Sequence, residues 1–251
     1  MINRTERLNM KEQYQRSALL LGEEAIDSLF NKRVCVFGLG GVGGSAMEAL
    51  ARAGIGHFDL IDNDTVNVTN INRQILATHK DVGRKKVDVA EERIHAINPE
   101  IEVRKFDIFY LPETRGLLSF EDYDYIVDAI DTVTAKIDII VRAKESGIRI
   151  ISAMGCGNRL NPSLLTAMDL FDTKGDPLSK VMRRELRKRG VTSLKVVCSK
   201  EEPTRPQNRE KYFSEEVLKR RKDIPGSTSF VPPAAGLLLA YTVIMDLLEQ
   251  K

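Results

Sequence analysis

The segment between residues 33 and 74 constrains the fold more than any other part of the chain. A short apolar run, residues 34–37, leads directly into Gly38-Leu39-Gly40-Gly41-Val42-Gly43. A second apolar run, residues 58–61, ends at Asp62, roughly 20 residues beyond these glycines. A strand, a glycine turn and a helix start place backbone N–H groups against a phosphate, and an acid after the second strand can hold a ribose hydroxyl. We therefore predict a nucleotide site that contains Gly38, Gly40, Gly41, Gly43 and Asp62.

Strand-like and helix-like segments alternate along the chain, which predicts an α/β fold: a Rossmann-like, doubly wound, mostly parallel sheet with helices on both faces. Strands are expected at residues 34–37, 58–61, 101–103, 125–127 and 148–152, and helices at 14–29, 41–53, 85–97 and 137–146. Beyond residue 157, shorter strands at 164–168 and 194–198 flank a basic helix at 178–189, and an apolar helix occupies 234–249.

This pattern predicts a single domain over residues 1–251. A nucleotide-binding core spans 30–157, and a C-terminal extension with antiparallel strands spans 158–251. Within the extension, residues 199–229 are polar and interrupted by prolines, so we expect a mobile loop with at least one helical turn.

Composition excludes several classes of protein. The formal net charge of the 251 residues is only +2, and the three cysteines lie far apart with no C-x-x-C pair. Neither a disulfide framework nor a four-cysteine zinc site is expected. The charged first 16 residues lack the apolar core of a signal peptide, and the longest apolar run, 231–245, is short for a membrane span. We expect a cytoplasmic protein without membrane association.

Polar residues follow several of the predicted strands. Those after the second strand are Asp64, Asn70, Arg73 and Gln74, Lys86 opens the next helix, and Asp128 and Asp131 follow the fourth strand. Open α/β sheets bind ligands at this carboxyl edge. The cations there favour ATP over NAD, and carboxylates beside phosphates suit Mg²⁺. A helix N-cap at Asp131 and solvated side chains at Arg73 and Lys86 are the alternatives.

Taken together, these motifs resemble the ubiquitin-activating superfamily of ATP-dependent adenylating enzymes (ThiF/MoeB type). In that family a carboxylate attacks the α-phosphate of ATP and becomes an acyl adenylate. The resemblance assigns Asp62 to the ribose, Arg73 and Lys86 to the phosphates, and Asp131 to Mg²⁺. Arg16, in the segment 14–19, resembles the arginine that reaches the ATP of the partner subunit in the family's homodimers.

Two branches of this superfamily are alternatives for the substrate. Members that activate a ubiquitin-like sulfur carrier commonly carry two zinc-binding C-x-x-C pairs, which this sequence lacks. Residues 176–190 instead resemble the branch of tRNA threonylcarbamoyladenosine dehydratases. That resemblance implies activation of the threonyl carboxylate on a modified adenosine beside the anticodon, followed by ring closure with release of AMP. Adenylation of a carrier protein's C-terminus, with a sulfur-relay partner, remains open. A NAD-binding protein is a third possibility, but it leaves Arg16, Arg73 and Lys86 without a role.

Basic residues in the C-terminal extension are grouped. Arg183, Arg184, Arg187, Lys188 and Arg189 lie in one predicted helix, and Lys211 with residues 219–222 forms a second group. Such groups favour contact with an RNA backbone, whereas the alternative is a solvated helix face with acids such as Glu185.

Two further features bear on mechanism and assembly. Cys35 is expected in the core, and nothing around Cys156 or Cys198 favours a nucleophile strongly. The helix at 234–249 is apolar nearly all round, which predicts a homodimer interface unless the domain itself buries the helix.

Overall fold

The computed structural model describes residues 12–220 and 224–249. Its centre is a seven-stranded sheet with the order β3-β2-β1-β4-β5-β7-β6. The strands are β1 (Arg33–Phe37), β2 (His57–Ile61), β3 (Glu102–Phe106), β4 (Tyr125–Asp128), β5 (Arg149–Ala153), β6 (Leu165–Asp169) and β7 (Lys195–Ser199). All neighbours pair in parallel except β6 and β7, which are antiparallel. The predicted doubly wound sheet with antiparallel strands in the extension is confirmed.

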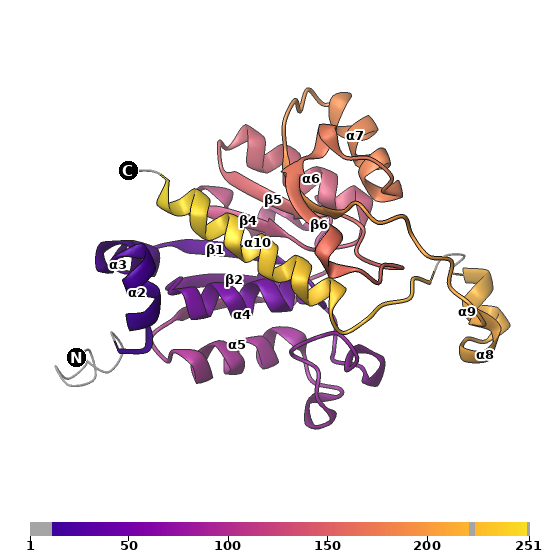
Figure 1. Ribbon diagram of the computed structural model, residues 1–251, viewed down its shortest axis with the longest axis horizontal. Helices are drawn as coiled ribbons and strands as arrows, with labels where there is room; N and C mark the ends of the chain where they lie inside the picture. The colour runs from indigo at the N-terminus through magenta and orange to yellow at the C-terminus, as the bar shows by residue number, and fades with distance from the viewer. Residues whose placement is uncertain (1–11, 221–223, 250–251) are drawn as a thin grey trace.

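Helices cover both faces of the sheet (Figure 1). The α-helices are α2 (Gln15–Leu21), α3 (Glu23–Phe30), α4 (Gly43–Ala53), α5 (Lys86–Ile97), α6 (Val133–Glu145), α7 (Pro177–Arg187), α8 (Arg209–Tyr212), α9 (Glu215–Arg220) and α10 (Val231–Leu248). Helices α4, α5 and α10 pack on one face, and α6 with α7 on the other. Short 3-10 helices lie at Val68–Asn70, His79–Asp81, Pro112–Leu117, Phe120–Asp122, Pro162–Leu164 and Leu170–Asp172.

The central strands supply side chains to two cores. In β1, Val34 and Val36 face the α4 side, whereas Cys35 and Phe37 face the α6 side, and all four are fully buried. Successive side chains of a strand point to opposite faces, so a strand covered on both sides must be apolar throughout. This is why residues 34–37 form a continuous apolar run. The chain order also reverses between β1 and β4, and ligands bind at such a switch point in α/β sheets.

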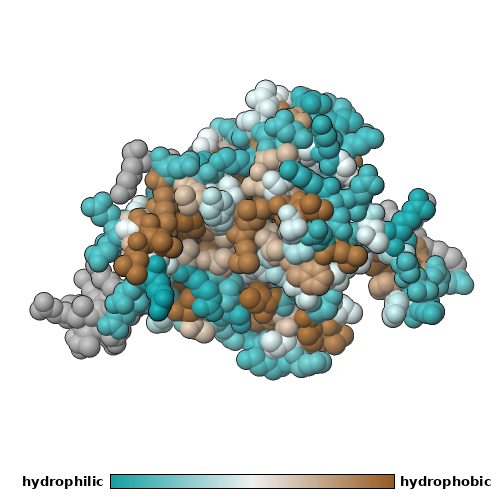
Figure 2. Space-filling view, in the orientation of Figure 1, coloured by the Kyte–Doolittle hydropathy of each residue, from teal (hydrophilic) through white to brown (hydrophobic). Residues whose placement is uncertain are grey.

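Helix α10 lies along α4 on the front of the molecule (Figure 1). The contact requires Gly236, because a Cβ there would lie 2.3 Å from the Val42 carbonyl oxygen. The domain therefore buries one side of α10, as the alternative interpretation of this helix held. Leu237 and Tyr241 remain 57% and 61% exposed, and Figure 2 shows apolar surface on this face of the molecule.

Two boundaries differ informatively from the sequence predictions. Helix α10 begins three residues earlier than expected, because Pro232 and Pro233 occupy its first turn, where proline is tolerated. The resulting 18-residue helix is long and apolar enough to cross a bilayer, although 56% of it is buried in the domain. Helix α6 begins at Val133, four residues before the predicted start at residue 137. The prediction was late because the first turn carries the polar residues Thr134 and Lys136, so the apolar pattern begins only after them.

The segment predicted as a mobile loop, 199–229, contains α8 and α9, which stand away from the body of the molecule (Figure 1). The end of this segment is attached to the turn after β5, where Asn158 Oδ1 accepts a hydrogen bond from the Gly226 N–H at 2.7 Å. Mobility of the segment remains a prediction.

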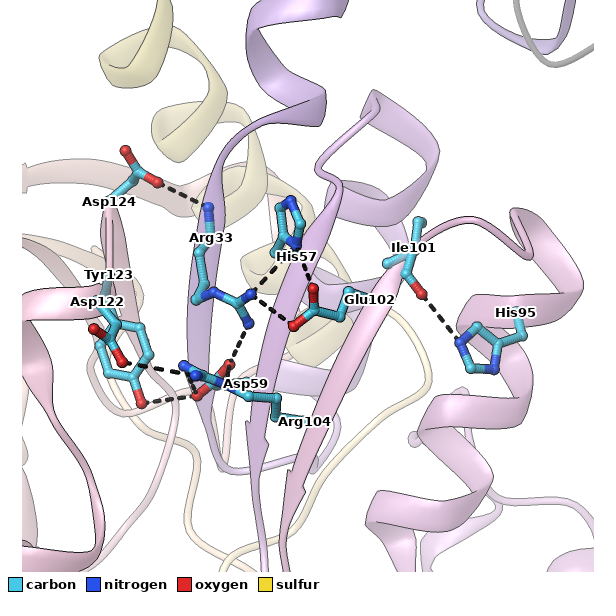
Figure 3. A network of polar contacts seen from close by, with 10 residues as sticks. All are labelled: Arg33, His57, Asp59, His95, Ile101, Glu102, Arg104, Asp122, Tyr123 and Asp124. Carbon is cyan, nitrogen blue, oxygen red and sulfur yellow. Dashed lines mark hydrogen bonds and ion pairs between the residues drawn. The ribbon is translucent and has the colours of Figure 1, made fainter. Parts of the chain in front are cut away.

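A network of ion pairs lies where β1, β2 and β3 begin (Figure 3). Asp59 is completely buried, and its carboxylate contacts Arg33 Nη1 at 3.0 Å and Arg104 Nε at 2.8 Å. The Tyr123 hydroxyl donates to the same carboxylate at 3.0 Å, and Arg33 also pairs with Glu102 at 2.8 Å. Both Asp59 oxygens therefore have partners, as a buried charge requires.

Candidate active site

The glycine turn between β1 and α4 is shaped by close backbone contacts. Gly38 has a φ of +86°, and a Cβ there would lie 2.8 Å from the Ala129 carbonyl oxygen. A Cβ at Gly43 would lie 1.8 Å from the Gly38 oxygen, and one at Gly41 would lie 3.1 Å from the Arg73 oxygen. No side chain caps the start of α4. The turn thus places the amino end of α4 at the carboxyl edge of the sheet, where helix N–H groups can receive a phosphate.

Asp62 connects the end of β2 to this turn. Its Oδ2 accepts a hydrogen bond from the Leu39 N–H at 2.7 Å, and its Oδ1 accepts one from the Asp64 N–H at 2.8 Å. Burial raises the pKa of Asp62, while Lys86 and these N–H groups act in the opposite direction. The sequence prediction that placed Asp62 beside the glycines agrees with this geometry, whereas contact with a ribose remains a prediction.

The two predicted phosphate-binding cations reach the same edge. Lys86 is 4% exposed, and its Nζ lies 2.7 Å from Asp64 Oδ2 and 3.7 Å from Asp62 Oδ2. Arg73 is half-buried and donates from Nη1 to the Thr69 carbonyl at 2.9 Å, and this burial lowers its pKa. Lys86 is therefore not the solvated side chain of the alternative interpretation.

Two predicted amides occupy different environments. Asn70 caps a short 3-10 helix, accepting a hydrogen bond from the Asn67 N–H at 3.0 Å. Gln74 is 8% exposed, and its Nε2 lies 3.9 Å from the position of a Cβ on Gly40. Among the described residues, Gln74 Oε1 has no hydrogen-bond partner although it is buried. Because an unpaired buried acceptor is costly, this atom beside the glycine turn fits a nucleotide that donates to it.

The two acids after β4 differ in position. Asp128 is fully buried: its Oδ2 lies 3.0 Å from Lys136 Nζ and accepts a hydrogen bond from Ser152 Oγ at 2.6 Å. This burial argues against the direct nucleotide contact predicted for Asp128, because protein groups already surround its carboxylate. Asp131 is exposed. The N-cap of α6 is Thr132, so the alternative interpretation of Asp131 as an N-cap is wrong.

The donor set at this edge fits Mg²⁺ shared with phosphates. Within residues 12–220 and 224–249, no group of three or more histidine, cysteine, aspartate or glutamate side chains is arranged to hold a metal. Asp131 is exposed and lies two residues beyond Ala129, whose carbonyl oxygen adjoins Gly38 of the glycine turn. Mg²⁺ commonly binds one or two carboxylates together with substrate phosphates and water, so Asp131 is sufficient on the protein side.

Sequence reasoning missed Lys136 and Ser152. Lys136 projects from α6 and Ser152 from β5 into the layer between them, and both are completely buried. A signal was present, because Lys136 has the same helical spacing as Ile139, Ile140 and Ala143 on the apolar face of α6. A lysine on such a face needs a buried partner, which Asp128 provides.

Arg16 does not join these residues within one chain. Helix α2 lies at the end of the molecule where the strands begin (Figure 1). Its neighbour Tyr14 donates to the Ala51 carbonyl at the far end of α4, and Asn98 Nδ2 donates to the Tyr14 hydroxyl at 3.1 Å. Arg16 is exposed there, so a role at the site requires a second subunit.

The basic helix α7 is partly neutralised. Glu185 pairs with Arg184 at 2.9 Å, Lys188 at 3.1 Å and Arg189 at 3.2 Å, and these hydrogen bonds lower the pKa of Glu185 to about 2. The other two cations also have neighbours, since Arg187 lies 5.0 Å from the Phe171 ring and Arg183 bonds to the Thr173 carbonyl at 2.8 Å. The interspersed acid of the alternative interpretation is thus present, and RNA contact stays a prediction.

The second basic group is only partly described. Lys211 lies in α8 and is exposed. Arg221 and Lys222 lie outside the described residues, as do the side chains of Lys219 and Arg220.

All three cysteines are buried, and burial raises the pKa of each thiol, that of Cys156 to about 12. A raised pKa disfavours the thiolate that a nucleophile needs. The environments of Cys156 and Cys198 therefore agree with the prediction that neither is a catalytic nucleophile.

Comparison with known proteins places this site in a family. The ThiF family matches residues 14–209. A tRNA threonylcarbamoyladenosine dehydratase of Bacillus subtilis is 41% identical over 246 residues, which cover 96% of each chain. The crystal structure of the E. coli tRNA N6-threonylcarbamoyladenosine dehydratase in complex with AMP has a TM-score of 0.87 and 32% identity, covering 100% of this chain and 98% of that one. A structure of the E. coli enzyme in complex with ATP has a TM-score of 0.84 and 31% identity over the same shares.

The family match covers more than half of the chain, and the sequence relative covers nearly all of it. Both predictions from the motifs, the adenylating superfamily and its tRNA branch, are confirmed. The chain belongs to the ThiF family and, within it, to the tRNA threonylcarbamoyladenosine dehydratases.

Proposed function

We propose that this protein is an ATP-dependent dehydratase of threonylcarbamoyladenosine in tRNA, acting in the cytoplasm. The threonyl carboxylate of the modified adenosine beside the anticodon attacks the α-phosphorus of ATP, and pyrophosphate leaves. An atom of the carbamoyl group then attacks the activated carbonyl carbon, a ring closes, and AMP leaves. The tRNA loses one water in total, and no cysteine nucleophile is needed.

One observation carries the assignment of ATP to this chain. The glycine turn, the β2 acid and the α5 lysine converge at one edge of the sheet, through the contacts of Asp62 with Leu39 and Lys86. The buried, unpaired Oε1 of Gln74 lies beside the same turn. These groups together offer N–H donors, a carboxylate and a cation, which are the partners of a nucleoside triphosphate.

The residues of the site then have distinct roles. Asp62 accepts from the ribose, with Asp64 and Asn70 shaping the segment around it. Arg73 and Lys86 offset the charge that develops on the α-phosphate and on departing pyrophosphate. Fixed cations in a partly buried site stabilise such charge more than water does. Asp131 would hold Mg²⁺, which would supply further positive charge beside the phosphates.

Assembly as a homodimer supplies the remaining cation. Arg16 is exposed at the opposite end of the molecule from the glycine turn of its own chain. The exposed Leu237 and Tyr241 on α10 offer an apolar surface for a second copy. In the dimer, Arg16 of each subunit reaches the ATP of its partner.

The basic face of α7 binds the tRNA backbone. Arg184 and Lys188 keep 67% and 62% of their side chains exposed although they pair with Glu185. Replacing Arg184 and Arg187 with glutamate should weaken tRNA binding and lower its salt dependence by about one unit of slope for each lost phosphate contact. ATP affinity should not change. Unchanged tRNA affinity would contradict the assignment of α7.

The decisive experiment measures AMP and pyrophosphate release from ATP and Mg²⁺ with tRNA that carries threonylcarbamoyladenosine. Mass spectrometry of the nucleoside should show the loss of one water. The same tRNA without the modification is the matched control and should not support AMP release. Release that depends instead on a small protein with a Gly-Gly tail would transfer the assignment to a sulfur carrier.

A further inference from the structure

Lys136 occupies an unusual position for a lysine. It lies in the first turn of α6, and both it and its ion-pair partner Asp128 are completely buried. Its Nζ lies 3.0 Å from Asp128 Oδ2 and donates to the Ile130 carbonyl at 3.1 Å. Two named contacts therefore fix the ammonium group, one to the end of β4 and one to the loop that follows it.

The loop that Lys136 contacts, residues 129–132, carries Asp131. Ala129 N–H donates to the Phe37 carbonyl at 2.8 Å, and the Ala129 oxygen lies so close to Gly38 that only glycine fits there. Lys136 Nζ donates to the carbonyl of the next residue, Ile130. The loop is thus fixed between the glycine turn and a buried ammonium group, with Asp131 one residue beyond the contact.

The pair is not explained by stability alone. Removing two opposite charges from water costs free energy that their attraction only partly returns, so a buried pair is weak evidence for stabilisation. Ser152 adds a hydrogen bond of 2.6 Å to Asp128 Oδ2, which fixes that carboxylate further. Lys136 and Asp128 contact Ile130 in this loop, and Ser152 acts on it through Asp128. Groups that orient a ligand in this way commonly matter for the function of the ligand itself.

We propose that Lys136 is a positioning residue for adenylation, which holds the loop of residues 129–132 so that Asp131 meets the phosphates beside the glycine turn. Lys136 touches neither substrate nor metal, and it acts through the Ile130 carbonyl and Asp128. This inference rests on the proposed role of Asp131.

The test is the affinity for ATP measured by calorimetry with and without Mg²⁺. The double variant Lys136→Met with Asp128→Asn removes both charges, so it leaves no unpaired ion in the core and should fold. It loses the bond to Ile130. We expect the dissociation constant of ATP with Mg²⁺ to rise about tenfold or more, as for lost partners of metal ligands, and that of ATP without Mg²⁺ to change far less. The single variant Lys136→Arg keeps the positive charge, so its affinity for ATP with Mg²⁺ should lie between those of the double variant and the wild type.

A control at the opposite end of the strands removes the ion pair between the buried Asp59 and the partly exposed Arg104, through Asp59→Asn with Arg104→Met. This control should leave both dissociation constants unchanged, which separates positioning from a general loss of stability. Equal affinities of the Lys136 double variant and the wild type in Mg²⁺ would overturn the inference. Asp131→Asn tests the premise separately: if it leaves the Mg²⁺ dependence unchanged, the proposed role of Asp131 fails. If Asp131→Asn weakens ATP binding in Mg²⁺ but the Lys136 double variant does not, the positioning role of Lys136 is refuted and the role of Asp131 stands.

Discussion

The two ends of the sheet treat buried polar groups differently. Where the strands begin, the Asp59 carboxylate contacts Arg33, Arg104 and Tyr123, and both of its oxygens have partners (Figure 3). Where the strands end, Gln74 Oε1 and two nitrogens of Arg159 are buried without a hydrogen-bond partner in the described part of the chain. Buried polar groups are normally paired, so unpaired ones identify the end at which the fold leaves room for a partner from outside.

This difference teaches that burial of charge alone does not identify a site. The Asp59 carboxylate is as deeply buried as the Asp128–Lys136 pair, although its partners Arg33 and Arg104 are 17% and 39% exposed. The Asp59 network lies where the strands begin, and its groups satisfy one another. The comparison predicts that substitutions at the two ends separate stability from binding.

The largest effect is expected for Asp59→Ala. Loss of this buried carboxylate leaves donors of Arg33, Arg104 and Tyr123 without their shared acceptor, which should lower the free energy of unfolding by about 3–5 kcal/mol. Denaturant titration measures this loss. Turnover per folded molecule should stay unchanged, because the network lies at the edge opposite the glycine turn. A fall in turnover without a loss of stability would show that the Asp59 network serves the site rather than the fold.

Arg73→Gln should have the opposite effects: a large fall in turnover and little change in the free energy of unfolding. Within the described residues, Arg73 donates to Thr69 and Asn72 of its own segment, so its loss leaves no buried charge there unpaired. Turnover should fall by about 10²–10³, or about 2.7–4 kcal/mol of transition-state stabilisation. The free energy of unfolding should change by less than about 1 kcal/mol. Arg52→Gln, which alters an exposed arginine paired with Glu48, is the control and should change neither quantity appreciably.

Gln74→Leu tests the unpaired acceptor directly. If Oε1 accepts a hydrogen bond from the nucleotide, its loss should weaken ATP binding by about 1 kcal/mol, or about fivefold in the dissociation constant. The free energy of unfolding without ATP should not fall, because the protein offers this atom no partner. Calorimetry and denaturant titration measure the two quantities. A destabilised apo protein with unchanged ATP affinity would show that Gln74 is structural.

The smallest effect concerns pH. Burial raises the pKa of Asp62 above its ordinary 3.8, so this carboxyl stays protonated to a higher pH in the folded state than in the unfolded chain. This contribution to the unfolding free energy therefore declines as pH rises from 3.8 through the folded pKa. The Arg33 hydrogen bond lowers the pKa of Glu102 below 4.5, so its contribution is present above pH 4.5 and is lost as pH falls through the folded pKa.

Two variants separate these opposite slopes. Asp62→Asn should remove the decline with rising pH, and Glu102→Gln should remove the loss at low pH. Unfolding free energies measured by denaturant titration between about pH 3 and 7 would resolve them. Slopes that are unchanged in both variants would mean that other carboxyls dominate the acid response.

Much of the fold was predictable because local patterns agree with the tertiary structure. Residues 34–37 are apolar throughout because helices cover both faces of β1, and that run together with the glycines sufficed to identify the nucleotide-binding turn. Asp62 could be placed because it ends β2, at the carboxyl edge that adjoins the turn.

Other residues could not be placed without coordinates. Asp128 and Asp131 are three positions apart and look equivalent in the sequence, yet one is fully buried and the other exposed. The alternation of β4 directs Asp128 under α6, where Lys136 neutralises it, and the chain leaves the strand before Asp131. Lys136 shares its helical spacing with the apolar face of α6, but that spacing does not show which group neutralises it.

The sequence by itself therefore determined the sheet, its glycine turn and the family, because each depends on short-range spacing of apolar residues, glycines and charges. Only the tertiary structure decided which charges are paired, which polar atoms lack partners, and that the domain covers one side of α10. These properties arise when β4, β5 and α6, separated along the chain, exclude water from a common space. Solvation of a side chain depends on that enclosure, and the identity of its sequence neighbours does not fix it.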